Sequence, residues 1–157
     1  MVRANGDGSA SAGAAASQVV RHGVAHDGAG LASLDPREVD GAIVANPYKK
    51  WSEIDSSLPD APIQVFGPPP TSGTRDAFVE LVMHDGCNEF PAIAALEETD
   101  ENRWEEVCGR MRQDGPFIEA GENDNLIVQR IEADPNALGI FGYSFLYENQ
   151  DKLQGVK

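Results

Sequence analysis

A strand, a proline-rich loop and the start of a helix follow one another in residues 63–78, IQVFGPPPTSGTRDAF. The apolar run Ile63–Phe66 lies between Pro62 and Gly67, which is typical of a short buried strand that ends in a rigid loop. After the loop, apolar residues recur every three to four positions, which predicts a helix with one buried face. These residues are Ala77, Phe78, Leu81 and Val82. This order indicates an α/β fold.

Two further passages support the same fold class. Phe117–Glu119 predicts a strand, and the turn GENDN at 121–125 leads into a helix that Asn or Asp caps. This helix ends at Asp134–Asn136, and the run Leu138–Tyr143 predicts another strand, whose glycines suggest close backbone approach. Residues 87–113 are predicted to be helical, with an interruption at the acidic turn 97–101.

Composition changes near residue 40. Of the first 34 residues, 19 are Ala, Gly or Ser, and the first aromatic residue is Tyr48. Few large side chains are available there to offset the conformational entropy lost on ordering. We therefore expect residues 1–38 to form a flexible segment outside the core, and residues 39–157 to form one folded lobe.

The charge balance excludes several classes of partner. The chain has 26 Asp and Glu against 12 Lys and Arg, a net charge of -14, so its long-range field repels nucleic acid and anionic lipid. No apolar run approaches the roughly 20 residues that cross a bilayer, so no membrane span is expected. Arg3 is not followed by the apolar stretch of about 7–15 residues that a secretory signal requires.

The loop and helix start at 67–78 form the strongest candidate binding site. A helix start presents unpaired backbone N–H groups and the positive end of a dipole, which together favour an anion. The hydroxyls of Ser72 and Thr74 and the guanidinium of Arg75 add donors, and Gly73 lets an anion approach the backbone. Taken alone, Thr71 or Ser72 could equally be a simple helix cap. The residues by themselves predict an oxyanion site at a helix start.

Three motifs together resemble the phosphate-binding component of bacterial phosphate ABC transporters. They are GPPPTSGTRDAF at 67–78, EAGENDNLIVQ at 119–129 and DPNALGIFGYSFLYEN at 134–149. The resemblance extends over residues 40–157 and implies a single lobe of a type 2 periplasmic-binding-protein fold, with a short mixed sheet flanked by helices. Members of that family have two lobes and hold dehydrated phosphate between them. By this resemblance, the chain would be one lobe, itself incomplete, of a two-lobed protein.

The resemblance also implies site residues. Ser72, Gly73 and Thr74 would donate to phosphate, and Arg75 is our candidate for the cationic contact, because many members have arginine where this chain has Pro68. The Ser/Thr-rich loop and the proton-accepting aspartate of the family's first lobe are not found here. An isolated lobe is therefore expected to bind phosphate weakly.

By the same resemblance, the chain would be a periplasmic solute-binding protein that requires no cofactor and delivers phosphate to a membrane permease. Two alternatives remain open. One is an enzyme that processes phosphate esters with Ser72 as nucleophile, although no base or metal site is recognisable near it. The other is an inactive, truncated lobe.

Other residues carry weaker signals. Cys87 and Cys108 could form a disulfide in an oxidising compartment, worth about 3 kcal/mol by loop entropy, or remain free thiols. His22 and His26 have the spacing of a helical metal pair but lack a third ligand, and no metal site is expected. We interpret the acidic residues 119, 122 and 124 as caps and a solvated face. Trp51 and Trp104 could stack on a ligand, but the sequence favours packing in the core.

Overall fold

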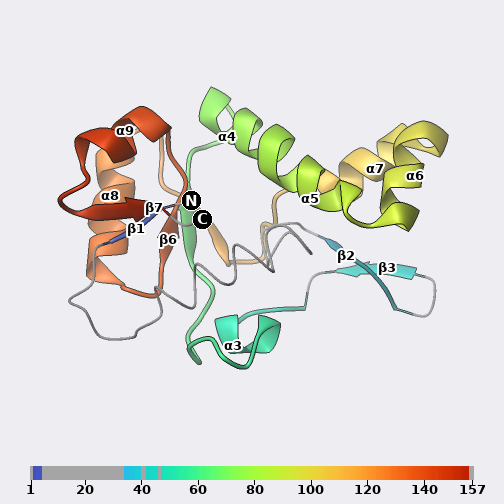
Figure 1. Ribbon diagram of the computed structural model, residues 1–157, viewed down its shortest axis with the longest axis horizontal. Coiled ribbons are helices and arrows are strands. Elements are labelled where there is room, and N and C mark those ends of the chain that lie inside the picture. Colours follow the sequence, from blue (N-terminus) through green and yellow to red (C-terminus); the bar gives the residue numbers. More distant parts are fainter. Residues whose placement is uncertain (1, 5–33, 40–41, 46, 156–157) are drawn as a thin grey trace.

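The computed structural model describes residues 2–4, 34–39, 42–45 and 47–155. These residues form a five-stranded sheet in the order β5-β4-β6-β1-β7 and a separate antiparallel pair, β2 and β3 (Figure 1). The strands are β1 (Val2–Ala4), β2 (Leu34–Val39), β3 (Ala42–Ala45), β4 (Val65–Gly67), β5 (Phe117–Glu119), β6 (Leu138–Gly139) and β7 (Leu153–Gly155).

The helices connect and cover these strands. They are α3 (Trp51–Ile54), α4 (Gly73–Phe78), the π-helical segment η3 (Val79–His84), α5 (Asp85–Asn88), α6 (Pro91–Thr99), α7 (Glu101–Cys108), α8 (Asp124–Ala133) and α9 (Tyr143–Glu148). Central strand β4 runs parallel to β5 and β6, whereas β1 runs antiparallel to β6 and β7. The sheet is thus mixed and flanked by helices, which confirms the expected fold class.

The two faces of β4 pack against different helices. Successive side chains of a strand point to opposite faces. Val65 joins a core cluster with Trp51, Phe78 and Met83 from α3, α4 and η3. Phe66 joins a second cluster that contains Ile127, Val128 and Ile131 of α8. Helix α8 therefore covers one face of the sheet, and residues of α3, α4 and η3 pack on the other.

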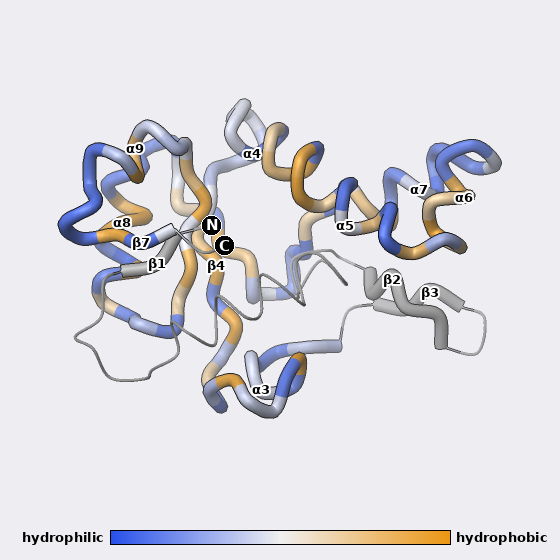
Figure 2. The backbone as a smooth tube through the Cα atoms, viewed as in Figure 1, coloured by the Kyte–Doolittle hydropathy of each residue, from blue (hydrophilic) through white to orange (hydrophobic). Residues whose placement is uncertain are grey.

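A third cluster lies in the helical arm α5–α7, which extends away from the sheet in Figure 1. Buried Ile93, Trp104 and Val107 pack there around a disulfide between Cys87 and Cys108. Figure 2 shows hydrophobic segments along the helix that leads into this arm and hydrophilic residues where α6 passes into α7.

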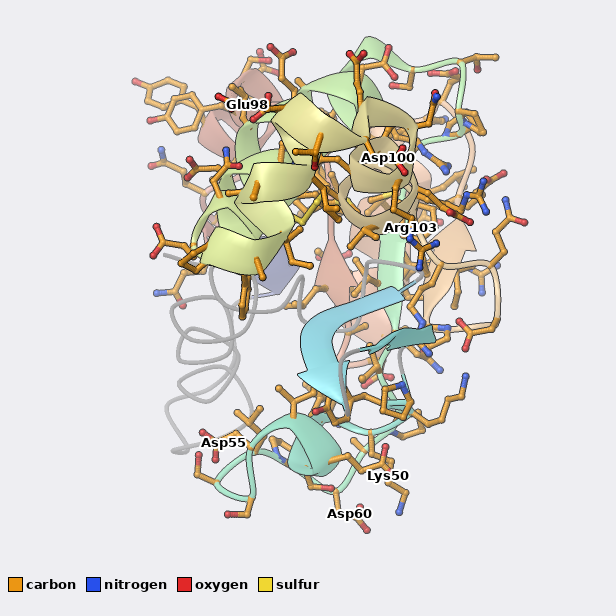
Figure 3. The ribbon with its side chains drawn as sticks, turned by 90° about the vertical axis from the view of Figure 1, so that its right-hand side faces the viewer. Lys50, Asp55, Asp60, Glu98, Asp100 and Arg103 are labelled. Atoms are coloured by element: carbon orange, nitrogen blue, oxygen red, sulfur yellow. A yellow bond between two sulfur atoms is a disulfide. The ribbon has the colours of Figure 1, made fainter. Side chains whose placement is uncertain are left out.

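Local contacts hold α3 and the arm in shape (Figure 3). Beside α3, Lys50 Nζ lies 2.8 Å from Asp60 Oδ1, and the indole Nε1 of Trp51 donates to the carbonyl of Asn136 at 3.0 Å. At the other end of that view, Asp100 caps α7 by accepting from the backbone N–H of Arg103 at 3.1 Å.

The buried face of the helix after the proline loop differs from the prediction. Phe78 is buried as expected, but Ala77 is exposed and Leu81 has 69% of its surface exposed. The reason is the π-helical turn in η3, whose wider i→i+5 spacing brings Met83, five residues after Phe78, into the core.

Two other predicted boundaries were wrong. The strand predicted over 138–143 stops at Gly139, because Gly142 takes the N-cap position of α9 and Tyr143 is already helical. The helical stretch predicted to reach residue 113 ends at Cys108, where Gly109 is the C-cap.

The N-terminal region contributes to the sheet. Strand β1 pairs with both β6 and β7, although residues 1–38 were expected to lie outside the core. Strand β2 also begins before residue 39 and pairs with β3. The boundary between residues 38 and 39 stays a prediction, but β1 precedes it and β2 runs across it. The Ala-rich run Ala10–Ala16, His22 and His26 lie outside the described residues.

Candidate functional site

The candidate site lies at the carboxyl ends of the neighbouring parallel strands β4 and β5, whose following helices pack on opposite faces of the sheet. Strand β4 leads into α4, which packs on the face of Val65, and β5 leads into α8, which packs on the face of Phe66. In open α/β sheets, such a switch between the carboxyl ends of strands creates a crevice where ligands bind. Loops 68–72 and 120–123 meet at this point.

Ser72 organises the first turn after β4. It is buried and is the N-cap of α4, and its Oγ accepts from the backbone N–H of Thr74 at 3.3 Å. Its carbonyl accepts from the N–H groups of Arg75 and Asp76 at 3.0 and 3.2 Å. Consequently, these early N–H groups are already used within the turn.

Gly73 offers the open position in this turn. Its N–H has no hydrogen-bond partner among the described residues, and a Cβ built on it would meet no atom within 4 Å. The backbone is therefore accessible at this residue, and the hydroxyl groups of Ser72 and Thr74 lie on either side of it in the sequence. Backbone and hydroxyl donors are thus available within one turn.

Arg75 is held between two residues of β5. Its Nη1 donates to Glu119 Oε1 at 3.0 Å, and its Cζ lies 5.2 Å from the centre of the Phe117 ring. Only 12% of the Arg75 side chain is exposed. A guanidinium has five N–H donors, so an ion pair through Nη1 leaves other donors of Arg75 for a ligand.

Carboxylates from the end of β5 and the loop after it also contact the residues that follow β4. Glu122 Oε1 accepts from the hydroxyl of Thr71 at 2.8 Å, which parallels the pairing of Glu119 with Arg75. Burial and then the charge of Glu122 raise the pKa of Asp124, at the start of α8. Caps and a solvated face therefore do not fully describe these acids, because Glu122 and Glu119 bind Thr71 and Arg75.

Sequence reasoning missed these contacts because the paired residues lie far apart in the chain. Thr71 and Glu122 are separated by 51 positions, and Arg75 and Glu119 by 44. The available signal was that both segments were predicted to link a strand to a following helix; where two such strands are parallel neighbours, their carboxyl ends meet at one edge of the sheet.

The remaining candidates lie away from the start of α4. Cys87 and Cys108 are joined by a disulfide in the helical arm, and Trp51 and Trp104 are buried in separate clusters. Within the described residues, no three His, Cys, Asp or Glu side chains gather in a way that could hold a metal ion. Across the described part of the chain, every helix is too short or too polar to cross a membrane.

Comparisons with known proteins agree with the resemblance. A family model described as a PBP superfamily domain matches residues 6–157. "Phosphate-binding protein PstS" of Staphylococcus haemolyticus is 32% identical over 111 residues, which cover 69% of this chain and 26% of that protein. "Protein SphX" of Synechococcus elongatus is 28% identical over 106 residues, which cover 68% of this chain and 24% of that protein.

A solved structure is also similar to this chain. It is the crystal structure of a possible phosphate binding protein from Planctomyces limnophilus, with 32% sequence identity and a TM-score of 0.46. The match covers 71% of this chain and 31% of that protein. The chain thus spans about a quarter of the curated relatives that it matches and under a third of this structure.

Proposed function

Because this chain belongs to the PBP superfamily and resembles one part of the phosphate-binding proteins, we propose that it binds inorganic phosphate where the start of α4 meets the end of β5. Ser72, Gly73, Thr74 and Arg75 are the proposed ligand-binding residues. The observation that carries the proposal is the open backbone N–H of Gly73, two residues before a largely buried cation and at the switch point of the sheet.

The donors suit an oxyanion stripped of water. Each phosphate oxygen that leaves water needs a replacement hydrogen bond, since an unsatisfied buried acceptor is costly. The Gly73 N–H and the hydroxyls of Ser72 and Thr74 would supply neutral donors. Arg75 would supply the positive charge through the N–H groups that Glu119 does not use.

The neighbouring carboxylates give a reason for selectivity. Glu119 and Glu122 lie at the end of β5 and in the loop after it, bonded to Arg75 and Thr71. A carboxylate can accept a hydrogen bond from the protonated oxygen of hydrogen phosphate, but it repels fully ionised sulfate. We therefore expect phosphate to bind more tightly than sulfate, even before any contribution from a second lobe.

The proposed role is that of a binding protein and not of an enzyme. It would capture phosphate outside the cytoplasm, in the periplasm, as the substrate-binding component of an ABC import system, and it would pass the ion to a membrane permease. No cofactor is required for this role. Because the relatives are about four times longer than the matched segment, we expect the chain alone to bind phosphate weakly.

Calorimetric titration with phosphate at low salt tests the site. We expect saturable heat from the wild-type chain, and an affinity at least about tenfold lower in Ser72→Ala and Arg75→Ala, because each substitution removes a hydrogen-bond donor to an anion. Sulfate added in the same cell should compete only poorly.

Matched substitutions elsewhere control for general effects. Ser56→Ala removes a hydroxyl from an exposed serine near α3, and Arg110→Ala removes an arginine whose side chain is 63% exposed. Both should bind phosphate like the wild type. The proposed site is wrong if a folded chain gives no heat with millimolar phosphate, or if Ser72→Ala binds as well as Ser56→Ala.

A further inference from the structure

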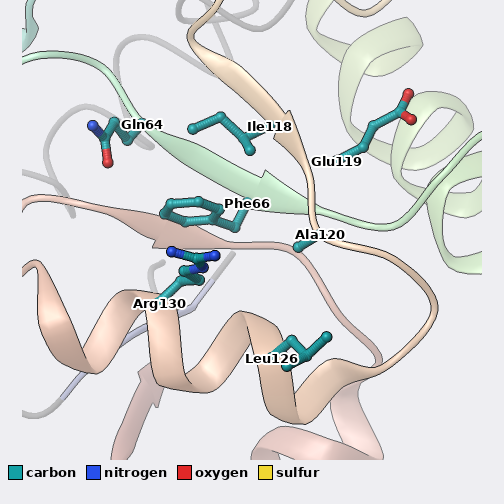
Figure 4. A pocket seen from close by; sticks show the side chains of 7 residues that line it. All are labelled: Gln64, Phe66, Ile118, Glu119, Ala120, Leu126 and Arg130. Atoms are coloured by element: carbon teal, nitrogen blue, oxygen red, sulfur yellow. The ribbon is translucent and has the colours of Figure 1, made fainter.

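A pocket of about 480 Å³ opens on the face of the sheet that α8 only partly covers (Figure 4). Helix α8 packs against β1, β4 and β6, whereas the pocket lies toward edge strand β5. Its volume falls within the range of small-molecule sites in proteins, about 300–1,000 Å³. It lies on the opposite face of the sheet from α4.

The periodicities of strand and helix explain which side chains line this pocket. Ile118 and Ala120 are two residues apart along β5 and its extension, so they share a face, as Gln64 and Phe66 do beside and within β4. Leu126 and Arg130 are four residues apart on α8 and share a helical face. The walls are therefore mainly apolar, and Leu126 is 47% exposed there.

Arg130 supplies the charge of the pocket. Its side chain extends from α8 toward the sheet, and Gln64 lies toward the same end of the pocket (Figure 4). Neither side chain has a hydrogen bond or ion pair to another residue in the described part of the chain. Glu119 also borders the pocket, but its carboxylate turns away and pairs with Arg75. One uncompensated positive charge thus faces an apolar pocket.

We propose that this pocket binds a small organic carboxylate. The apolar part of the ligand would lie against Phe66, Ile118 and Leu126, where it removes apolar surface from water. The carboxylate would accept charge-assisted hydrogen bonds from Arg130 and a further hydrogen bond from the amide of Gln64. This site is separate from the proposed phosphate site and does not depend on it.

The test uses two probes of similar shape, 4-phenylbutyrate and the uncharged 4-phenylbutanol, titrated into the full chain and followed by amide chemical shifts. We expect both probes to shift amides of β5 and the start of α8, with the carboxylate binding more tightly. Arg130→Gln should weaken 4-phenylbutyrate about tenfold or more and leave 4-phenylbutanol unchanged. Arg130→Lys should keep part of the preference, because it keeps the charge but not the planar fork.

Control variants distinguish binding in this pocket from a general effect of net charge and from binding at the proposed phosphate site. Arg110→Gln lowers the net charge equally at an exposed arginine just after the helical arm, and Ser72→Ala alters the phosphate site, so both should bind 4-phenylbutyrate like the wild type. Leu126→Gln should weaken both probes. The proposal fails if the folded wild type shows no saturable binding at millimolar 4-phenylbutyrate, if the shifts lie elsewhere, or if Arg130→Gln and Arg110→Gln bind it equally.

Discussion

At the scale of single residues, the most buried charge in the described chain belongs to Arg112, with 2% of its surface exposed. Its Nε and Nη2 donate to the two carboxylate oxygens of Asp114 at 2.6 and 2.7 Å, and its Nη1 donates to the carbonyl of Tyr48 at 2.8 Å. Lys49 also contacts Asp114. These contacts, the Arg112 pair first among them, hold the pKa of Asp114 well below its usual range.

This pair predicts a pH dependence of stability. An acid whose pKa is lower in the folded chain stabilises the fold above its unfolded pKa, about 3.9 for Asp, and loses that contribution as pH falls toward the folded pKa. At pH 7, Asp114→Asn should therefore have a lower urea concentration at the unfolding midpoint than the wild type. This difference in midpoint should shrink below about pH 4. Urea unfolding at pH 7, 4 and 3 measures it.

Asp85 is exposed, so Asp85→Asn serves as the matched control. Its urea midpoint should differ little from that of the wild type at all three pH values. A difference between wild type and Asp114→Asn that was the same at all three pH values would show that the carboxylate charge does not stabilise the fold.

Gly139 allows β6 and α8 to approach each other closely. A Cβ at this position would lie 2.8 Å from Cγ2 of Ile127 and 3.1 Å from Cε1 of Phe141. Gly139→Ala should therefore lower the free energy of unfolding by about 1–3 kcal/mol, as overpacking does in other cores. At Gly142, the N-cap of α9, a Cβ would have only an ordinary contact, 3.8 Å from Ser144 Oγ, so Gly142→Ala should cost less and only through alanine's weaker N-cap preference. Equal stability of the two variants in urea would show that close packing at Gly139 does not determine the effect.

At the scale of elements, the helical arm depends on its disulfide. The bond joins α5 to the end of α7 across a sequence separation of 21, and both sulfur-bearing residues are buried in the arm's own cluster. Replacing both cysteines by serine should reduce the free energy of unfolding by about 3 kcal/mol, because the unfolded chain gains conformational freedom.

Guanidinium unfolding of the oxidised wild type, the reduced wild type and the double serine variant measures this effect. The reduced wild type should resemble the variant, and a reductant should leave the variant unchanged. A loss below about 1 kcal/mol would mean that packing around Ile93 and Trp104 alone holds the arm together.

The sequence predicted some elements well because local signals determined them. The strand before the proline loop, the strand at Phe117–Glu119 and the capped helix α8 each have a clear pattern and a clear end signal. The π-helical turn was not predictable from periodicity, since a spacing of 3.6 residues placed Leu81 in the core. Strand β1 was missed because three residues, Val2–Ala4, are too few to show an alternating pattern.

At the scale of the whole molecule, sheet order brings together residues that the sequence keeps apart. The donors Ser72 to Arg75 were identified from a helix-start motif, whereas the carboxylates Glu119 and Glu122 face them only because β5 lies next to β4. The pocket beside Arg130 was missed for the same reason, because its walls come from β4, β5 and α8. Local chemistry can thus predict one side of a crevice, but strand order determines what faces it.

The separation of the core into clusters also has a practical consequence. The two tryptophans of the chain lie in different clusters, Trp51 beside the sheet and Trp104 beside the disulfide in the arm. Indole fluorescence responds to the loss of a buried environment, so each ring reports on its own region. In a variant with one tryptophan replaced by phenylalanine, the fluorescence comes from the remaining indole alone. One such variant therefore reports on the sheet and the other on the arm. Comparing their melting curves reveals whether these regions unfold as one cooperative unit.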